Sequence, residues 1–207
     1  MTPDPPIDLA NKITVVTGPP DSGKSTFVKW LLGRPEYASH LIYDPMFGYP
    51  TDSHNAIRPP TQQTKYRRYE HGNPELNEAV DRFVLVDEDK RPDYFAIDES
   101  GRLLPNQQPE GSAMGELNDF NAHYGIGVIV IGQRLAQINS DFENKATRYF
   151  CMGVSGKNDR RTLESVHEDF PEYVEASEQY GPTYVRIDDN SICNFGPPPM
   201  TGSKAGL

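Results

Sequence analysis

The most informative stretch of the sequence for chemistry is a loop that runs from Gly18 to Ser25. It fits the pattern G-x-x-x-x-G-K-[ST] at every fixed position, between a β-prone run at 13–16 and a helix-like segment at 26–32. Such a loop turns its backbone N–H groups inward as a cradle for an anion, and the helix behind it directs the positive end of its dipole to the same place. The stretch therefore predicts a phosphate-binding loop.

The residue types in this loop each have a physical role. Gly18 and Gly23 let the backbone approach the phosphates where a Cβ would collide. Lys24 is expected to reach the β- and γ-phosphates, and the Ser25 hydroxyl is expected to bind Mg²⁺. Pro19 and the proline after it carry no N–H, so the donors should come mainly from the residues that follow. The predicted nucleotide-binding residues are Gly18, Pro19, Asp21, Ser22, Gly23, Lys24, Ser25 and Thr26, together with Asp44 further along the chain.

Two adjacent carboxylates, Asp98 and Glu99, follow an apolar strand predicted at 94–97. The carboxyl end of a parallel strand lies near the ligand crevice of an α/β sheet. There, Asp98 can hold Mg²⁺ through its water shell, and Glu99 can activate a water for attack on a γ-phosphate. An apolar strand that ends in Asp-Glu is a weak motif alone, but downstream of a phosphate loop it indicates hydrolysis.

Two other predicted strands also end in polar residues. The run at 126–131 is the most apolar of the chain and indicates a central strand buried on both faces. Gln133 follows it, and an amide there either hydrogen-bonds the γ-phosphate and the attacking water or only caps the strand. Asp44 follows a short strand at 39–43, and Pro45 keeps it extended. Asp44 therefore either lies at the ligand crevice or starts a turn.

Composition limits the class of protein. The 207 residues include 20 basic and 30 acidic side chains, a net charge of −10, which argues against broad coating of nucleic acid but leaves room for a local basic patch. The densest basic-aromatic stretch, 64–69, is either an edge strand or a phosphate-contacting surface. No apolar run reaches the length of a membrane span and residues 1–9 contain no signal sequence, so we expect an intracellular protein without a membrane span.

The remaining elements must position these side chains. We expect one domain at 10–194, preceded by a flexible arm at 1–9 and followed by a disordered, Gly/Pro-rich tail at 195–207. Phe83 and Phe120 are expected to face the core from helices. Strands that alternate with helices predict an α/β fold with a mostly parallel sheet. The further predicted elements are helices at 25–33, 73–85 and 114–124, a helix that is capped by Asn158 or Asp159 and runs to about 168, and strands at 149–154 and 183–187.

With these pieces in order, the chain resembles the FtsK–HerA superfamily of DNA-pumping ATPases. The stretches that carry the resemblance are Gly18–Ser25, Leu41–Pro45, Asp98-Glu99, Gln133-Arg134, Asn144, Thr147, Arg148 and Ser155–Leu163. The resemblance implies a RecA/ASCE-type P-loop NTPase fold, in which helices flank a central, mostly parallel sheet. Its five core strands, numbered along the chain, should lie in the order 5-1-4-3-2.

A single domain of this length looks like the genome-packaging ATPases of tailless icosahedral viruses with an internal membrane, including archaeal ones. That resemblance implies a ring, a hexamer or pentamer, in which an arginine of one subunit completes the neighbour's active site. By position, Arg148 is the first candidate for this arginine finger, with Arg161 and Arg160 as second choices. The implied partners are double-stranded DNA, bound independently of sequence, and a viral capsid or portal vertex. The implied location is the host cytoplasm during assembly or the virion vertex.

The implied function is an ATPase that uses ATP and Mg²⁺ to package viral double-stranded DNA into a preformed capsid. Lys24 would contact the phosphates, Ser25 and Asp98 the Mg²⁺, Glu99 the attacking water, and Gln133 the γ-phosphate. The alternatives are an assembly ATPase like the zonula-occludens-toxin family of filamentous phages, a small nucleotide kinase, and a module that holds ATP as a structural ligand. A kinase would need an arginine-rich lid, and the acid pair with the amide fits hydrolysis better.

Overall fold

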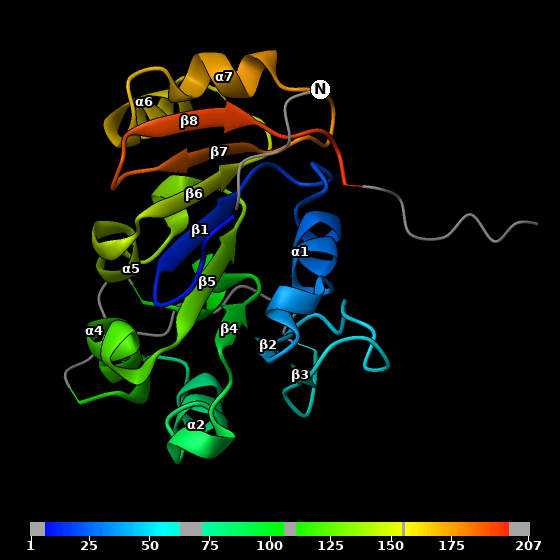
Figure 1. Cartoon of the computed structure of the whole chain (residues 1–207), viewed down its shortest axis with the longest axis vertical. Helices are drawn as coiled ribbons and strands as arrows, with labels where there is room; N and C mark the ends of the chain where they lie inside the picture. The colour runs from blue at the N-terminus through cyan, green and yellow to red at the C-terminus, as the bar shows by residue number, and fades with distance from the viewer. Residues whose placement is uncertain (1–6, 63–71, 106–110, 155, 199–207) are drawn as a thin grey trace, which may run out of the picture.

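The computed structural model describes residues 7–62, 72–105, 111–154 and 156–198, which form an α/β fold around one sheet (Figure 1). Its strands are β1 (Ile13–Thr17), β2 (His40–Tyr43), β3 (Ala56–Ile57), β4 (Tyr94–Ile97), β5 (Gly127–Gly132), β6 (Arg148–Cys151), β7 (Thr183–Arg186) and β8 (Ser191–Asn194). They lie in the order β3-β2-β4-β5-β1-β6-β7-β8. The pairs from β3 to β6 are parallel, and β7 and β8 are added antiparallel.

The order of the five predicted core strands is confirmed. Read from the other edge, β6-β1-β5-β4-β2 corresponds to 5-1-4-3-2. The structure adds β3 outside β2 and the hairpin of β7 and β8 outside β6. Of these, β3 and β8 were not predicted, since β3 is two residues long within a Pro- and Ser-rich loop and β8 carries exposed ends. The phosphate loop follows β1, which lies between β5 and β6 in the interior of the sheet.

Helices cover both faces of this sheet (Figure 1). The helices are α1 (Lys24–Leu32), α2 (Pro74–Phe83), α3 (Ser100–Leu103), α4 (Ala113–Tyr124), α5 (Ser140–Lys145), α6 (Lys157–Val166) and α7 (Phe170–Ala176). Helix α1 packs on one face, and α2, α4, α5, α6 and α7 contribute to the core on the other. None of the described helices combines the length and apolar character needed to cross a membrane.

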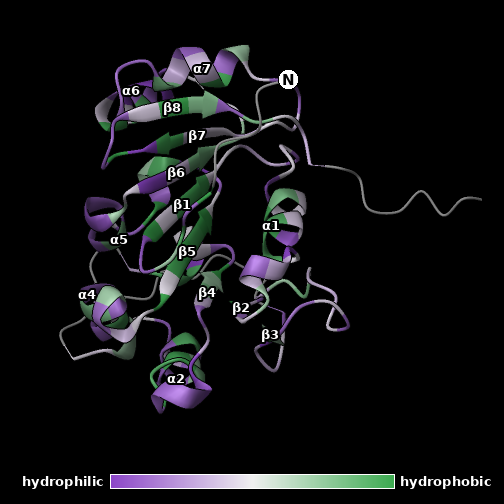
Figure 2. Cartoon of the chain, viewed as in Figure 1, coloured by the Kyte–Doolittle hydropathy of each residue, from purple (hydrophilic) through white to green (hydrophobic). Residues whose placement is uncertain are grey.

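The sheet separates two apolar cores, because neighbouring residues of a strand point to opposite faces. Val15 belongs to the core under α2 and α4, and Val16 to the core under α1, and both are fully buried. Every residue of β5 is buried, as predicted for a strand covered on both faces. Figure 2 shows the apolar strands at the centre and mixed or hydrophilic helices around them.

The prediction that two aromatic side chains face the core is wrong. Phe83 is 42% exposed and Phe120 is 52% exposed. Phe83 is the last residue of α2, where the helix leaves the sheet. In α4, the buried face is centred on Leu117 and on Asn121, whose side-chain amide donates to the Ile126 carbonyl at 3.0 Å, so that Phe120 is turned outward.

Helix ends agree with the predicted boundaries to differing degrees. Asn73 caps α2 as predicted, and its side chain accepts the Leu76 N–H at 3.1 Å. The N-cap of α6 is Gly156, two residues before Asn158, the nearer of the two predicted caps, and its φ of 119° suits glycine. Helix α7 was not predicted.

The chain ends are more ordered than expected, as far as they are described. Leu9 is 1% exposed and the Tyr37 hydroxyl donates to the Ile7 carbonyl at 2.7 Å, so residues 7–9 are packed. Phe195 is 5% exposed, and its N–H donates to the Pro182 carbonyl at 2.9 Å. The expected arm and tail are therefore wrong for 7–9 and 195–198. Their outer parts, 1–6 and 199–207, and the basic stretch 64–69 lie outside the described residues.

Candidate nucleotide-binding and catalytic site

The predicted site residues follow the carboxyl ends of adjacent parallel strands. Gly18 follows β1 and Gln133 follows β5, and these two strands pair up to Thr17 and Gly132. Asp44 follows β2 and Asp98 follows β4, whose last residues are also paired. The end of the sheet where the parallel strands finish therefore carries the phosphate loop, Asp44, Asp98 and Gln133.

The phosphate loop has the backbone of an anion cradle. Gly18, Asp21 and Gly23 have φ values of 152°, 60° and 94°, in the region that favours glycine. A Cβ on Gly18 would lie 2.8 Å from both the Met152 carbonyl oxygen and the Ser22 hydroxyl, so the loop closes only with glycine there. Helix α1 starts directly after Gly23, and the N–H groups of its first turn have no acceptor within the helix.

The Lys24 ammonium lies inside this loop and donates to the Pro19 carbonyl at 2.7 Å. Burial lowers the pKa of Lys24, and the carboxylates of Glu99, Asp98 and Asp21 oppose that shift. A lysine in this position gains from an anion, because a phosphate would offset the loss of its hydration. The placement agrees with its predicted contact to phosphates.

Asp98 is a buried carboxylate at the predicted metal position. It is 8% exposed, and its Oδ1 accepts the Glu99 N–H at 2.8 Å. Burial raises the pKa of Asp98 to about 6, and the negative charges of Glu99 and Asp44 add to the shift. Burial near other acids disfavours its charged form, so a cation at this position would be stabilising.

Tyr49 also lies at this site, and no motif in the sequence points to it. Its side chain is 1% exposed, and its hydroxyl lies beside Asp98 and Ser25 without full hydrogen-bond geometry to any described group. Burial raises the pKa of Tyr49 well above its usual value, and Asp98 and Asp44 add to the shift. The hydroxyl is therefore a neutral oxygen held next to the predicted Mg²⁺ residues.

The structure assigns Asp44 to a turn. Asp44 is fully buried, and its carboxylate accepts the N–H groups of Gly48 at 2.8 Å and Tyr49 at 3.0 Å. Arg58 adds a contact to the same carboxylate at 3.4 Å and also donates to the Tyr49 carbonyl. Both oxygens of Asp44 are thus used within the chain, which does not support the predicted direct contact with a nucleotide. Its role is to fix the turn that carries Tyr49.

Glu99 and Gln133 lie together, as the sequence predicted. The Gln133 side-chain amide donates to Glu99 Oε2 at 3.4 Å, and Arg102 forms an ion pair with the same oxygen at 3.1 Å. Glu99 has a φ of 52°, which is uncommon outside glycine and typical of strained functional positions. Ser100 anchors this turn to β5, because its hydroxyl donates to the Ile131 carbonyl at 2.8 Å.

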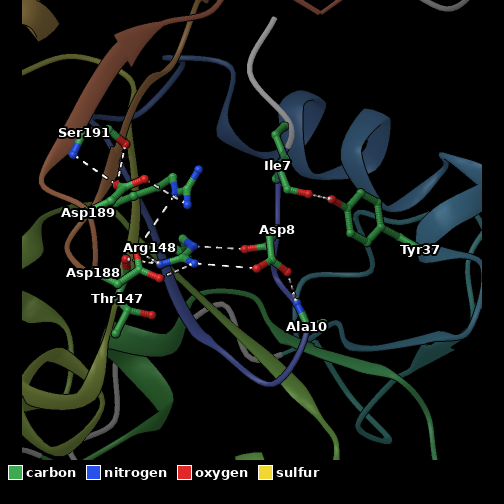
Figure 3. A network of polar contacts seen from close by, with 10 residues as sticks. Ile7, Asp8, Ala10, Tyr37, Thr147, Arg148, Asp188, Asp189 and Ser191 are labelled. Carbon is green, nitrogen blue, oxygen red and sulfur yellow. Dashed lines mark hydrogen bonds and ion pairs between the residues drawn. The ribbon is translucent and has the colours of Figure 1, made fainter.

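Arg148 occupies a different place from the one predicted. It is 1% exposed and pairs with β1 at Thr14, at the amino end of that strand and away from the phosphate loop. Its guanidinium donates to both carboxylate oxygens of Asp188 at 2.8 Å and to the Asp8 carbonyl at 3.0 Å (Figure 3). A buried guanidinium with these partners cannot reach a neighbouring subunit, so the structure does not support Arg148 as an arginine finger.

The two second-choice arginines lie on α6. Arg160 is engaged by three glutamates of the same chain, Glu164, Glu172 and Glu175. Arg161 is exposed and forms no ion pair within the part of the chain that the structure describes. Of the three predicted arginines, Arg161 is therefore the one that is exposed and has no ion pair among the described residues.

The site fits Mg²⁺ by its donor chemistry. Mg²⁺ is usually held by one or two protein oxygens together with phosphates and water. Ser25, Asp98 and the unsatisfied Tyr49 hydroxyl provide such oxygens beside the phosphate loop. Among the described residues, no group of three or more His, Cys, Asp or Glu side chains could hold a metal ion. The two cysteines, Cys151 and Cys193, are free thiols.

Solved structures share this architecture. The genome-packaging NTPase B204 of Sulfolobus turreted icosahedral virus 2, in complex with sulfate, matches with a TM-score of 0.71 and 17% identity over 92% of this chain and 98% of its own. Its complex with ATP-γ-S gives 0.65 and 19% over 90% and 98%. The chain therefore has the fold of this genome-packaging NTPase. EssC from Geobacillus thermodenitrificans, in its ATPases 2 and 3, matches with a TM-score of 0.54 and 14% identity over 93% of this chain and 40% of its own.

At these identities the likeness shows the fold alone, and that fold is the α/β P-loop fold that the resemblance implied. No protein-family model matches the sequence. An orsellinic acid synthase from Beauveria bassiana is 34% identical over 89 residues, which are 42% of this chain. The chain spans 4% of that protein's length.

Proposed function

We propose that this chain is an ATP-hydrolysing DNA translocase that packages viral double-stranded DNA into a preformed capsid. The observation that carries the proposal is the meeting of Lys24, Asp98, Glu99 and Gln133 at one sheet edge, with the Gln133 amide 3.4 Å from the Glu99 carboxylate. The fold match to B204, which is described as a genome-packaging NTPase and was crystallised with ATP-γ-S, supports the same assignment.

The phosphates of ATP bind in the cradle at 18–25. The positive φ values of the loop turn its N–H groups inward, and Lys24 exchanges its contact with the Pro19 carbonyl for phosphate oxygens. Ser25 and Asp98 hold Mg²⁺, with the Tyr49 hydroxyl beside them. When bound, Mg²⁺ neutralises charge on the β- and γ-phosphates.

Hydrolysis depends on Glu99 and Gln133. The Glu99 carboxylate accepts a proton from the attacking water, and the Gln133 amide orients that water and the γ-phosphate. In this structure Arg102 holds Glu99 through an ion pair, so Glu99 must loosen that pair to reach the water. When the γ-phosphate leaves after hydrolysis, Gln133 loses a hydrogen-bond partner. The loop after β5 therefore responds to whether the bound nucleotide still has its γ-phosphate.

Motor action requires a ring of this chain, a hexamer or pentamer. The exposed Arg161 supplies the arginine finger to the neighbouring site in place of Arg148. The finger would stabilise the charge of the transition state, an effect of about 10³-fold or more in rate. Double-stranded DNA is gripped through its phosphates, independently of sequence, and the ring docks at a capsid or portal vertex during assembly in the host cytoplasm.

Phosphate release with and without double-stranded DNA tests this proposal. Wild-type protein should hydrolyse ATP faster when DNA is added, and the stimulation should fall steeply with salt because phosphate contacts dominate. An ATPase rate that does not respond to DNA at any salt concentration would contradict translocation. Transfer of the γ-phosphate to a nucleoside monophosphate would instead identify a kinase.

A further inference from the structure

The cavity at the phosphate loop is also lined by residues from outside the loop. It has a volume of about 490 Å³, within the range of small-molecule sites. Besides residues of the loop and of the start of α1, an aromatic ring and two prolines line it. Its lining residues are Asp21, Gly23, Lys24, Ser25, Thr26, Tyr180, Pro197 and Pro198.

Tyr180 is fixed at this cavity by an unusual backbone. Its φ is 66°, in the left-handed region, and its side chain is 49% exposed. The ring lies against the phosphate loop, since a Cβ on Gly23 would come within 3.1 Å of the Tyr180 ring. Gly181 locks the turn, because its N–H donates to the Glu178 carbonyl at 2.9 Å and a Cβ there would lie 2.5 Å from the Phe195 carbonyl. An exposed aromatic ring held in a strained conformation indicates a function rather than a packing role.

The two prolines come from the segment that follows β8. Phe195 anchors that segment, since it is 5% exposed and its ring lies 5.8 Å from the Tyr184 ring. Pro198 is buried, and Pro197 is exposed beside it. The segment after β8 therefore lies beside the phosphate loop and lines the same cavity.

The chemistry of Tyr180, Pro197 and Pro198 suits a flat, apolar ring. A tyrosine face stacks on any nucleobase, and proline rings supply apolar surface without an N–H donor. None of the described residues that line the cavity is an Asn or Gln whose side chain could read the edge of a base. The same cavity is lined by Lys24, Ser25 and Thr26, so a ligand in it can contact the phosphate loop and the three rings together.

We propose that Tyr180, with Pro197 and Pro198, forms the subsite for the base of the bound nucleoside triphosphate. The subsite holds the base by stacking and accepts adenine and guanine alike. This inference rests on the proposed function only for the presence of a nucleotide at the phosphate loop.

Binding of three ligands to the full chain tests the subsite. Tyr180→Gly removes the ring and suits the positive φ, so the fold is retained. Calorimetry with ATP, GTP and inorganic tripolyphosphate, all with Mg²⁺, should show about tenfold weaker binding of ATP and GTP, the order of magnitude of one lost stack. Binding of tripolyphosphate should stay the same, because it has no base.

Two further variants sharpen the result. Tyr180→Phe keeps the ring and should bind ATP as wild type does. Tyr173→Ala removes a tyrosine that is 39% exposed on α7, outside the cavity lining, and should leave all three affinities unchanged.

Two outcomes would overturn the subsite. Equal weakening of ATP and tripolyphosphate in Tyr180→Gly would mean that the ring only supports the phosphate loop. Unchanged ATP binding in that variant would mean that the base lies elsewhere. A wild-type chain that binds neither ATP nor tripolyphosphate would instead contradict the proposed function, so the two failures are distinguishable.

Discussion

At the scale of single residues, burial raises the pKa of Asp98. Without a cation, the buried carboxylate carries a charge that the fold disfavours, and its pKa is about 6 instead of 3.8. A carboxyl whose pKa is higher in the folded state binds its proton more tightly there, so its contribution favours folding below the unfolded value. That contribution is lost as the pH rises from about 4 to 6.

Asp98→Asn should therefore change stability in a pH-dependent way. Measured by urea unfolding without nucleotide or Mg²⁺, the variant should gain about 1 kcal/mol relative to wild type between pH 5 and pH 7, because only wild type must bury the charge. The reference for this comparison is Asp119→Asn, which removes the same charge from an exposed side chain. A stability difference between Asp98→Asn and wild type that stays constant over this range would contradict the raised pKa.

Tyr49→Phe separates stability from metal binding at the same site. The hydroxyl makes no well-formed hydrogen bond with a described group, so its loss should change the free energy of unfolding by no more than about 1 kcal/mol. The Mg²⁺ concentration that gives half-maximal ATP hydrolysis should rise, because an oxygen beside Ser25 and Asp98 is lost. An unchanged Mg²⁺ requirement would reduce Tyr49 to a packing residue.

At the scale of elements, Arg148 joins three segments that are distant in sequence. Its guanidinium connects the start of β6 to Asp8 of the amino-terminal segment and to Asp188 in the turn between β7 and β8 (Figure 3). Arg148 also lowers the pKa of Asp188. A carboxylate with a lowered pKa stabilises the fold above its unfolded value, and that stabilisation is lost as the pH falls through the lowered value.

Arg148→Ala should consequently weaken the fold. Removing a buried, fully paired guanidinium should lower the free energy of unfolding by about 2–4 kcal/mol in urea titrations. Arg161→Ala is the matched control, because Arg161 is exposed and has no ion pair among the described residues, so its stability should equal that of wild type. An Arg148→Ala protein as stable as wild type would contradict the structural role of this network.

The elements that the sequence predicted are those whose signals are local. The phosphate loop, the acid pair after β4 and Gln133 after β5 each follow an apolar run, and parallel strands bring such ends together. Arg148 was misjudged because its position along the chain carries no information about burial, and its partners Asp8 and Asp188 are 140 and 40 residues away. Tyr180 was missed for the same reason, since only the return of the chain after α7 brings it to Gly23.

At the scale of the whole molecule, a site shared between subunits predicts complementation. Arg161→Ala should lose most of its ATPase activity by losing the finger, and Lys24→Ala should lose it by losing phosphate binding. Mixed in equal amounts, the two variants should regain part of the wild-type rate, because some interfaces then combine an intact loop with an intact finger. Mixtures no more active than the separate proteins would assign the finger to another residue or remove it from the mechanism.

Glu99→Gln tests most directly the claim that this sheet edge hydrolyses ATP. In the presence of double-stranded DNA, phosphate release and ATP affinity are measured on the same preparation. Because the amide keeps the shape of the side chain but cannot accept the proton, ATP should bind as it does to wild type while turnover falls by about 10²-fold or more. A variant that binds ATP and still hydrolyses it at the wild-type rate would show that Glu99 does not activate the water.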